Sequence, residues 1–136
     1  MTYEDRYGRL LLFADYLCYF DRKNNKIIKS TKLDDKFYAH SISEDKSGNL
    51  WLGSHTTGVV KLAYNNRTQS YEYKILNKVN VTPKNSNYVV IDDKERIWIG
   101  TQTKGLFQYD IREDRLVNIL NDKTDITSIS DNSINS

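Results

Sequence analysis

The chain has 136 residues, 38% hydrophobic and 28% charged, which suits a soluble globular protein with one ordinary core. Twenty Lys and Arg against eighteen Asp and Glu leave a formal charge of +2 without a run of five like charges, which argues against a nucleic-acid partner. The single cysteine, Cys18, excludes an internal disulfide framework, and no signal-like segment or membrane-spanning apolar run is visible, so no direct membrane insertion is expected.

The first predicted elements lie within residues 1–33. Asp5 to Leu12 matches Asp45 to Leu52 at an offset of 40 residues, with a leucine in place of the tryptophan. This segment is expected to begin just before the second strand of its unit. Its predicted third and fourth strands are Leu17 to Asp21 and Lys26 to Lys29.

The middle unit, residues 34–80, carries the clearest pattern. A half-apolar stretch is followed by the Asp and Gly residues of a tight turn and by an apolar strand, which predicts a hairpin. A polar loop bounded by Gly53 and Gly58 leads to a second hairpin. The predicted strands are Tyr38 to Ile42, Leu50 to Leu52, Val59 to Tyr64 and Ser70 to Ile75.

The third unit, residues 81–122, repeats this plan, with its tryptophan 47 residues after the first one. Its predicted strands are Tyr88 to Ile91, Ile97 to Ile99, Leu106 to Tyr109 and Arg115 to Leu120. Residues 123–136 are expected to start the first strand of another unit.

Three four-stranded antiparallel meanders therefore fill the chain, and no helix-period segment is visible. A sheet of roughly 45 residues cannot bury both faces alone, and radial repetition solves this problem in β-propellers. The sequence predicts an all-β fold of three propeller blades, with a parallel β-helix as the weaker alternative.

Three blades are too few for a closed ring, since propellers typically have about four to eight. We expect that the chain is part of a longer propeller, or that copies self-associate, for example as a six-bladed dimer. In such a dimer, Ser133 to Asn135 would pair with the first blade of the partner.

Residues that recur in register are predicted to be structural. Asp45 and Asp92 are expected to cap hairpin turns, because their spacing lacks the alternating oxygen ligands of a calcium loop. Trp51 and Trp98 are expected to fill the core between blades rather than to stack on sugars. The glycines of this set are Gly48, Gly53, Gly58, Gly100 and Gly105.

The run Asp45 to Ser54, followed by Gly58, resembles the two-component regulator propeller repeat, and Asp92 to Thr101 with Gly105 is similar to it. Glu95, which stands in the position of the first turn glycine, departs from the pattern. The resemblance extends over essentially the whole chain. It implies the periplasmic sensor region of hybrid two-component histidine kinases of gut Bacteroidetes, which responds to glycan breakdown products. A non-enzymatic role with an oligosaccharide ligand and no cofactor is implied.

Neither catalytic residues nor a metal site are predicted. His40 and His55 are the only histidines, and they are expected in different settings, one in a strand and one in a loop. No nucleophile elbow, phosphate loop or zinc spacing occurs. Two other classes stay open: a scaffold without a small-molecule ligand, and a lyase-type catalytic propeller, which would need a His and acidic cluster on one rim.

A ligand of a propeller is expected at the rim where the loops between second and third strands meet the linkers between units. The predicted linkers are Ser30 to Lys36 and Asn77 to Asn85. The loop residues suited to binding a sugar or peptide are His55, Thr56, Gln102, Thr103 and Lys104.

Overall fold

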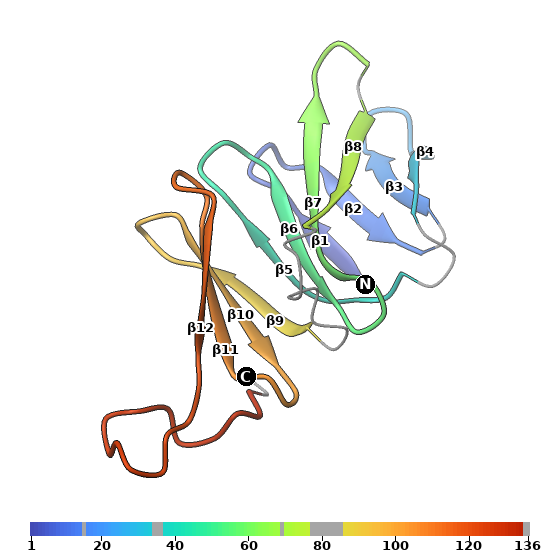
Figure 1. Cartoon of the computed structure of the whole chain (residues 1–136). Coiled ribbons are helices and arrows are strands. Elements are labelled where there is room, and N and C mark those ends of the chain that lie inside the picture. Colours follow the sequence, from blue (N-terminus) through green and yellow to red (C-terminus); the bar gives the residue numbers. More distant parts are fainter. Residues whose placement is uncertain (15, 34–36, 69, 77–85, 135–136) are drawn as a thin grey trace.

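The chain folds into antiparallel β-sheets (Figure 1). The computed structural model describes residues 1–14, 16–33, 37–68, 70–76 and 86–134. In these residues, twelve strands form three four-stranded sheets, and each strand pairs with its neighbour along the chain within its sheet. The all-β prediction of three antiparallel meanders is therefore confirmed.

Each sheet is one continuous meander. The first contains β1 (Thr2–Glu4), β2 (Leu10–Phe13), β3 (Tyr16–Asp21) and β4 (Lys26–Lys32). The second contains β5 (Ala39–Glu44), β6 (Leu50–Ser54), β7 (Gly58–Asn65) and β8 (Ser70–Ile75). The third contains β9 (Ser86–Ile91), β10 (Arg96–Thr101), β11 (Leu106–Asp110) and β12 (Arg115–Ile119).

The first sheet has a first strand that the sequence did not reveal. We expected this sheet to begin just before its second strand, and that expectation is wrong. Strand β1 pairs antiparallel with β2, with Tyr3 opposite Leu11. Its three residues carry too little alternation to be recognised as a strand, but they are long enough to complete the meander.

The turn between the first and second strands has the same backbone in the second and third sheets. Gly48 has a φ of 81°, and its N–H donates to the carbonyl of Asp45 at 3.0 Å. Glu95 holds the matching position with a φ of 63°, and its N–H donates to the carbonyl of Asp92 at 3.0 Å. The left-handed conformation costs a non-glycine residue roughly 1–2 kcal/mol. The turn geometry is thus kept without glycine, at a cost in stability.

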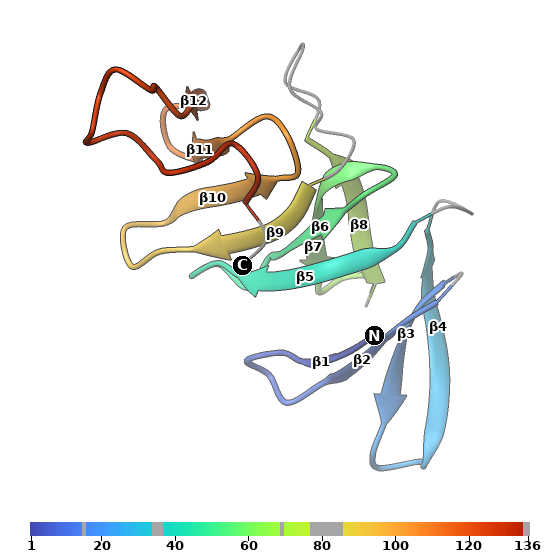
Figure 2. The same cartoon turned by 90° about the horizontal axis from the view of Figure 1, so that it is seen from below.

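The sheets fan out from one side, with β1, β5 and β9 on the inner side and the last strand of each sheet on the outer side (Figure 2). Two apolar layers hold them together. The layer between the first and second sheets contains Leu11, Leu17, Leu33, Phe37, Leu50, Leu52, Val60, Leu62 and Tyr71. The layer between the second and third sheets contains Trp51, Val59, Val89, Ile97, Ile99, Phe107 and Tyr109.

Strand β6 separates these layers, because side chains along a strand alternate between its two faces. Leu50 and Leu52 are fully buried and pack toward the first sheet. Trp51, only 3% exposed, points toward the third sheet. The alternation in one short strand thus lets the second sheet bury both of its faces.

A tyrosine from the second sheet replaces the indole donor that the first sheet lacks. The Tyr71 hydroxyl donates to Asp5 Oδ2 at 3.1 Å, and the Arg9 guanidinium donates to the same oxygen at 2.6 Å. Asp5 is only 5% exposed, so its carboxylate depends on these donors. Burial raises the pKa of Tyr71, which keeps its hydroxyl protonated. A side-chain hydrogen bond therefore ties the first two sheets together.

The change Tyr71→Phe is expected to lower the free energy of unfolding by about 1–2 kcal/mol, because it removes one donor from a buried carboxylate and keeps the ring. Denaturant titration of the chain measures this loss. Tyr64→Phe is the matched control, since the Tyr64 ring packs on Tyr71 with centroids 5.1 Å apart. An equal loss in both variants would contradict a role for the hydrogen bond.

The tail after β12 returns to the third sheet. The N–H of Gly105 donates to the carbonyl of Asn132 at 2.8 Å, and the N–H of Ile134 donates to the carbonyl of Thr101 at 2.8 Å. A Cβ on Gly100 would lie 2.7 Å from Ile134 Cγ2, so the tail needs glycine there. Within one chain, residues 132–134 thus contact their own β10–β11 end, while Asn135 lies outside the described residues.

Candidate ligand-binding site

The two recurring aspartates each hold a tryptophan through the same contact. Asp45 Oδ2 accepts the indole N–H of Trp51 at 2.9 Å, and Asp92 Oδ2 accepts that of Trp98 at 3.0 Å. The other carboxylate oxygen in each case accepts two backbone N–H groups of its own turn. Burial acts to raise the pKa of Asp92, but hydrogen bonds from Trp98 and Arg96 outweigh it and hold that pKa well below its usual range.

The five predicted rim residues lie in two equivalent loops. His55 and Thr56 belong to the β6–β7 loop, and residues 102–104 form the exposed β10–β11 loop. Both loops lie at the end of their sheets away from the aspartate turns (Figure 1). Each is braced by a buried hydroxyl: Thr56 N–H donates to Ser54 Oγ at 3.3 Å, and Lys104 N–H donates to Thr101 Oγ1 at 2.9 Å.

Residues 34–36 and 77–85 of the predicted linkers lie outside the described residues. The site residues that are described present amide, hydroxyl, imidazole and ammonium groups to solvent, which suits hydrogen bonding to sugar hydroxyls. Ligand binding at this rim stays a prediction.

The two histidines meet at the β5–β6 edge. Their strand and loop settings are as predicted, and the fold nevertheless brings the two rings together. The register of β5 shifts between Ala39 and Ser41, which leaves His40 as an extra residue beside Ser54. The rings of His40 and His55 pack edge to face with centroids 3.9 Å apart.

This contact predicts a pH dependence of stability. Desolvation first, and the neighbouring His55 second, lower the pKa of His40. Since the folded-state pKa lies below the unfolded value of about 6.5, the unfolded chain takes up a proton first as pH falls. The stability that depends on neutral His40 is therefore expected to be fully present above the unfolded pKa of about 6.5. It is expected to decrease as the pH falls from there toward the folded-state pKa.

Melting temperatures of the wild type and His40→Gln between neutral and mildly acidic pH measure this effect. The variant is expected to lose part of the acid-side decrease. His55→Gln is expected to have a smaller effect than His40→Gln, because it removes the charge repulsion and leaves the desolvation of His40. Identical pH profiles for wild type and His40→Gln would refute the assignment.

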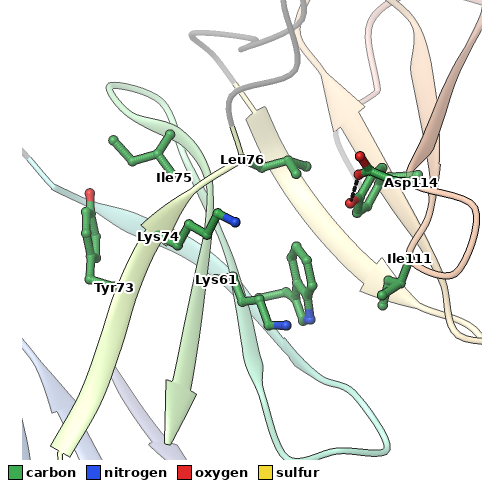
Figure 3. A pocket seen from close by; sticks show the side chains of 9 residues that line it. Lys61, Tyr73, Lys74, Ile75, Leu76, Ile111 and Asp114 are labelled. Atoms are coloured by element: carbon green, nitrogen blue, oxygen red, sulfur yellow. Dashed lines mark hydrogen bonds between the residues drawn. The ribbon is translucent and has the colours of Figure 1, made fainter.

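A cleft of about 800 Å³ lies between the outer strands of the second and third sheets (Figure 3). Lys61 and Lys74 project into it from the second sheet, and Ile111 and Asp114 face them from the third. The other lining residues are Trp51, Tyr73, Ile75, Leu76 and Tyr109. None of the predicted rim residues lines this cleft.

Sequence reasoning missed this cleft because its walls come from two units. One signal was present: Lys61 interrupts the apolar run that begins at Val59, and Lys74 lies two residues before Leu76 in a strand that alternates polar and apolar residues. A lysine at a core-facing position of a strand indicates either a paired charge or a polar site. Only the cross-strand register shows that the two lysines are neighbours.

Three stacked four-stranded meanders define the chain as a segment of a β-propeller. The repeat type follows from residues 32–56, which match the family model described as two component regulator propeller. This match confirms the resemblance stated from the sequence for residues 32–56, which contain the run Asp45 to Ser54.

Solved structures share this fold. The chain is similar to the extracellular domain of a one-component system from B. thetaiotaomicron, with a TM-score of 0.71, 18% identity and coverage of 99% of this chain and 18% of that one. A second structure, described as the extracellular domain of a hybrid two-component system from B. thetaiotaomicron, gives a TM-score of 0.66 and 19% identity over 86% of this chain and 18% of that one. Our chain thus spans 18% of the length of these two structures.

A more distant similarity connects the fold to an enzyme. Virginiamycin B lyase from Staphylococcus aureus matches with a TM-score of 0.61 and 9% identity over 93% of this chain and 42% of the lyase. At this identity the likeness concerns the propeller fold alone. No curated protein matches the chain.

The described residues hold neither a cluster of metal-binding side chains nor a membrane-spanning helix. No group of three or more His, Cys, Asp and Glu side chains is placed to hold a metal ion there, so His40 and His55 have no third ligand in that part of the chain. In the same residues, no helix is long and apolar enough to cross a membrane.

Proposed function

We propose that this chain is a non-enzymatic, ligand-sensing segment of a propeller in a hybrid two-component signalling system. The observation that carries the proposal is the two-component regulator repeat at residues 32–56, set within a stack of propeller sheets. The similarity to extracellular domains of such systems supports an extracytoplasmic, periplasmic location. The ligand that we propose is an oligosaccharide released from a glycan.

The segment works with further blades. Its two outer sheet faces expose apolar side chains, including Ile27 at 62% and Val90 at 55% exposure. Other blades of a longer propeller or a second copy of the chain cover these faces in our proposal. Ligand contacts that span neighbouring sheets then alter the packing between them, and a kinase elsewhere in the system responds.

Binding to immobilised oligosaccharides tests the proposal. The chain is expected to bind a subset of glycan fragments, and His55→Ala, Gln102→Ala and Lys104→Ala are expected to weaken binding about tenfold where the rim loops form the site. Lys26→Ala, an exposed lysine of β4, is the matched control. Absence of binding to all glycan classes would favour the scaffold alternative.

A catalytic propeller is the second candidate, and the fold of virginiamycin B lyase motivates it. A lyase of this kind requires a histidine beside acidic groups. Among the described residues, the feature that comes nearest to this is the His40–His55 pair, which contains no acidic side chain. Turnover of a streptogramin by the chain, with loss of turnover in His55→Ala, would favour this class over the sensor.

A further inference from the structure

Two lysines lie directly opposite each other on the face of the second sheet that points toward the third. Lys61 of β7 pairs in register with Lys74 of β8, and both ammonium groups point into the cleft (Figure 3). Like charges directly opposite each other on a sheet are destabilising. The pair therefore destabilises the chain when no ligand is bound, and the fold itself does not explain why both positions carry a lysine.

The matching positions of the other sheets do not carry this charge. Each sheet has an equivalent row of cross-strand neighbours, which faces the next sheet in the first two sheets and lies on the outer face in the third. The row is Tyr3, Leu11, Tyr19 and Ile28 in the first sheet, Ser43, Trp51, Lys61 and Lys74 in the second, and Val90, Trp98, Gln108 and Val117 in the third. The propeller architecture therefore does not require lysines at these positions.

Neither lysine is neutralised by a described residue. Arg9 and Arg96 each form an ion pair with the aspartate of their own turn, at 2.6 Å in both cases. No carboxylate of the described chain lies within ion-pair distance of Lys61 or Lys74. The contact of Lys61 is the ring of Trp51, whose centroid lies 5.3 Å from Nζ.

The rest of the cleft offers the surfaces of a small-molecule site. The buried indole of Trp51 with Leu76 and Ile111 forms an apolar wall, and the cleft volume of about 800 Å³ lies within the range of ligand pockets. On the opposite side, Asp114 accepts the Tyr109 hydroxyl at 2.5 Å. That carboxylate stands at the edge of the cleft with partners of its own.

We propose that this cleft binds an acidic sugar residue, one that bears a carboxylate or a sulfate. The two ammonium groups bind the anion, and the apolar wall contacts the sugar ring. The anion specificity rests on the lysine pair alone, while the sugar part rests on the proposed sensor function. Because the walls belong to the second and third sheets, the bound ligand bridges two blades.

Calorimetric titration of the 136-residue chain tests the proposal. The ligands are cellobiouronate, its neutral counterpart cellobiose, and inorganic sulfate. Cellobiouronate is expected to bind about tenfold or more tightly than cellobiose, and more weakly as salt is raised. Lys61→Gln and Lys74→Gln are each expected to reduce its affinity about tenfold, whereas Lys26→Gln is expected to leave it unchanged.

The variants also have a readout that does not need a ligand. Without ligand, Lys74→Gln is expected to melt at or above the wild-type temperature at low salt, because it removes the repulsion between the two ammonium groups. A lower melting temperature would show that Lys74 stabilises the fold, and this would overturn the premise of an uncompensated charge pair.

The outcomes separate this inference from the sensor function. Sulfate binding that depends on both lysines, without binding of either disaccharide, would keep the anion site and refute its acidic-sugar ligand, while the sensor function would still be decided by the immobilised oligosaccharides. Sugar binding that Lys104→Gln weakens and the cleft variants do not would keep the sensor function and refute the cleft. Equal affinity for the acidic and neutral disaccharides, or no binding of cellobiouronate and sulfate, would also refute the proposal.

Discussion

Replacing Trp51 with alanine is expected to lower the free energy of unfolding by about 3–5 kcal/mol, the typical loss for a large aromatic residue in a core. Trp51 is only 3% exposed and lies in the layer between the second and third sheets. Its ring also packs near Tyr109, with centroids 6.1 Å apart. The change therefore opens a cavity between two sheets, and leaves Asp45 without its indole donor.

Trp98→Ala is the matched comparison. Trp98 makes the same hydrogen bond to its turn aspartate, at 3.0 Å, but it lies on the outer face of the third sheet and is only partly buried. Its loss is expected to be about 1–2 kcal/mol, mostly from the hydrogen bond and the partly buried ring. Urea denaturation of both variants gives the two values, and equal losses would contradict the assignment of Trp51 to the shared core.

Trp51→Phe is a milder change at the same position, and it provides a result if Trp51→Ala does not fold. It keeps an aromatic ring between the sheets and removes only the N–H that Asp45 accepts. Its stability is expected to fall between those of the wild type and Trp51→Ala. A phenylalanine variant as unstable as the alanine variant would assign the whole effect to the hydrogen bond rather than to packing.

The fold was predictable because its signals are local. An aspartate turn followed by a short apolar strand is contained within about ten residues, and turn chemistry and alternation determine both parts. The same local pattern survives in the third sheet although Glu95 replaces the turn glycine, because its backbone adopts a φ of 63°. Strand β1 was missed because three residues are too few to show a period.

The contacts between units were not predictable from any single repeat. The approach of His40 to His55 depends on a register shift inside β5, which no composition signal marks. The hydrogen bond from Tyr71 to Asp5 joins residues 66 positions apart, in different sheets. Sites that form between repeats are thus hidden in the sequence, even where the repeats themselves are plain.

The two outer faces predict how the chain behaves in solution. On the third sheet, Val90, Trp98 and Val117 belong to one cross-strand row, and Val90 is 55% exposed. The corresponding row of the second sheet packs through Trp51 against its neighbour. A face with this geometry and an apolar row is suited to pack against another propeller sheet.

The first sheet offers the complementary face. Its outer row of Leu10, Phe20 and Ile27 matches the row of Leu50, Leu62 and Tyr73, which packs toward the first sheet in the layer described above. Ile27 is 62% exposed. We propose that the third sheet of one copy packs on the first sheet of another, so that two such contacts would close a six-bladed ring.

Sedimentation at micromolar concentration is accordingly expected to give about twice the 15.9 kDa mass of one chain. The double change Val90→Lys and Val117→Lys is expected to return the chain to a monomer, because it places two charges in the middle of the contact. Ile126→Lys is the control, since Ile126 is fully exposed in the tail outside the row. A wild-type chain that is monomeric and stably folded would contradict the association, because two uncovered apolar faces would then carry no measurable cost.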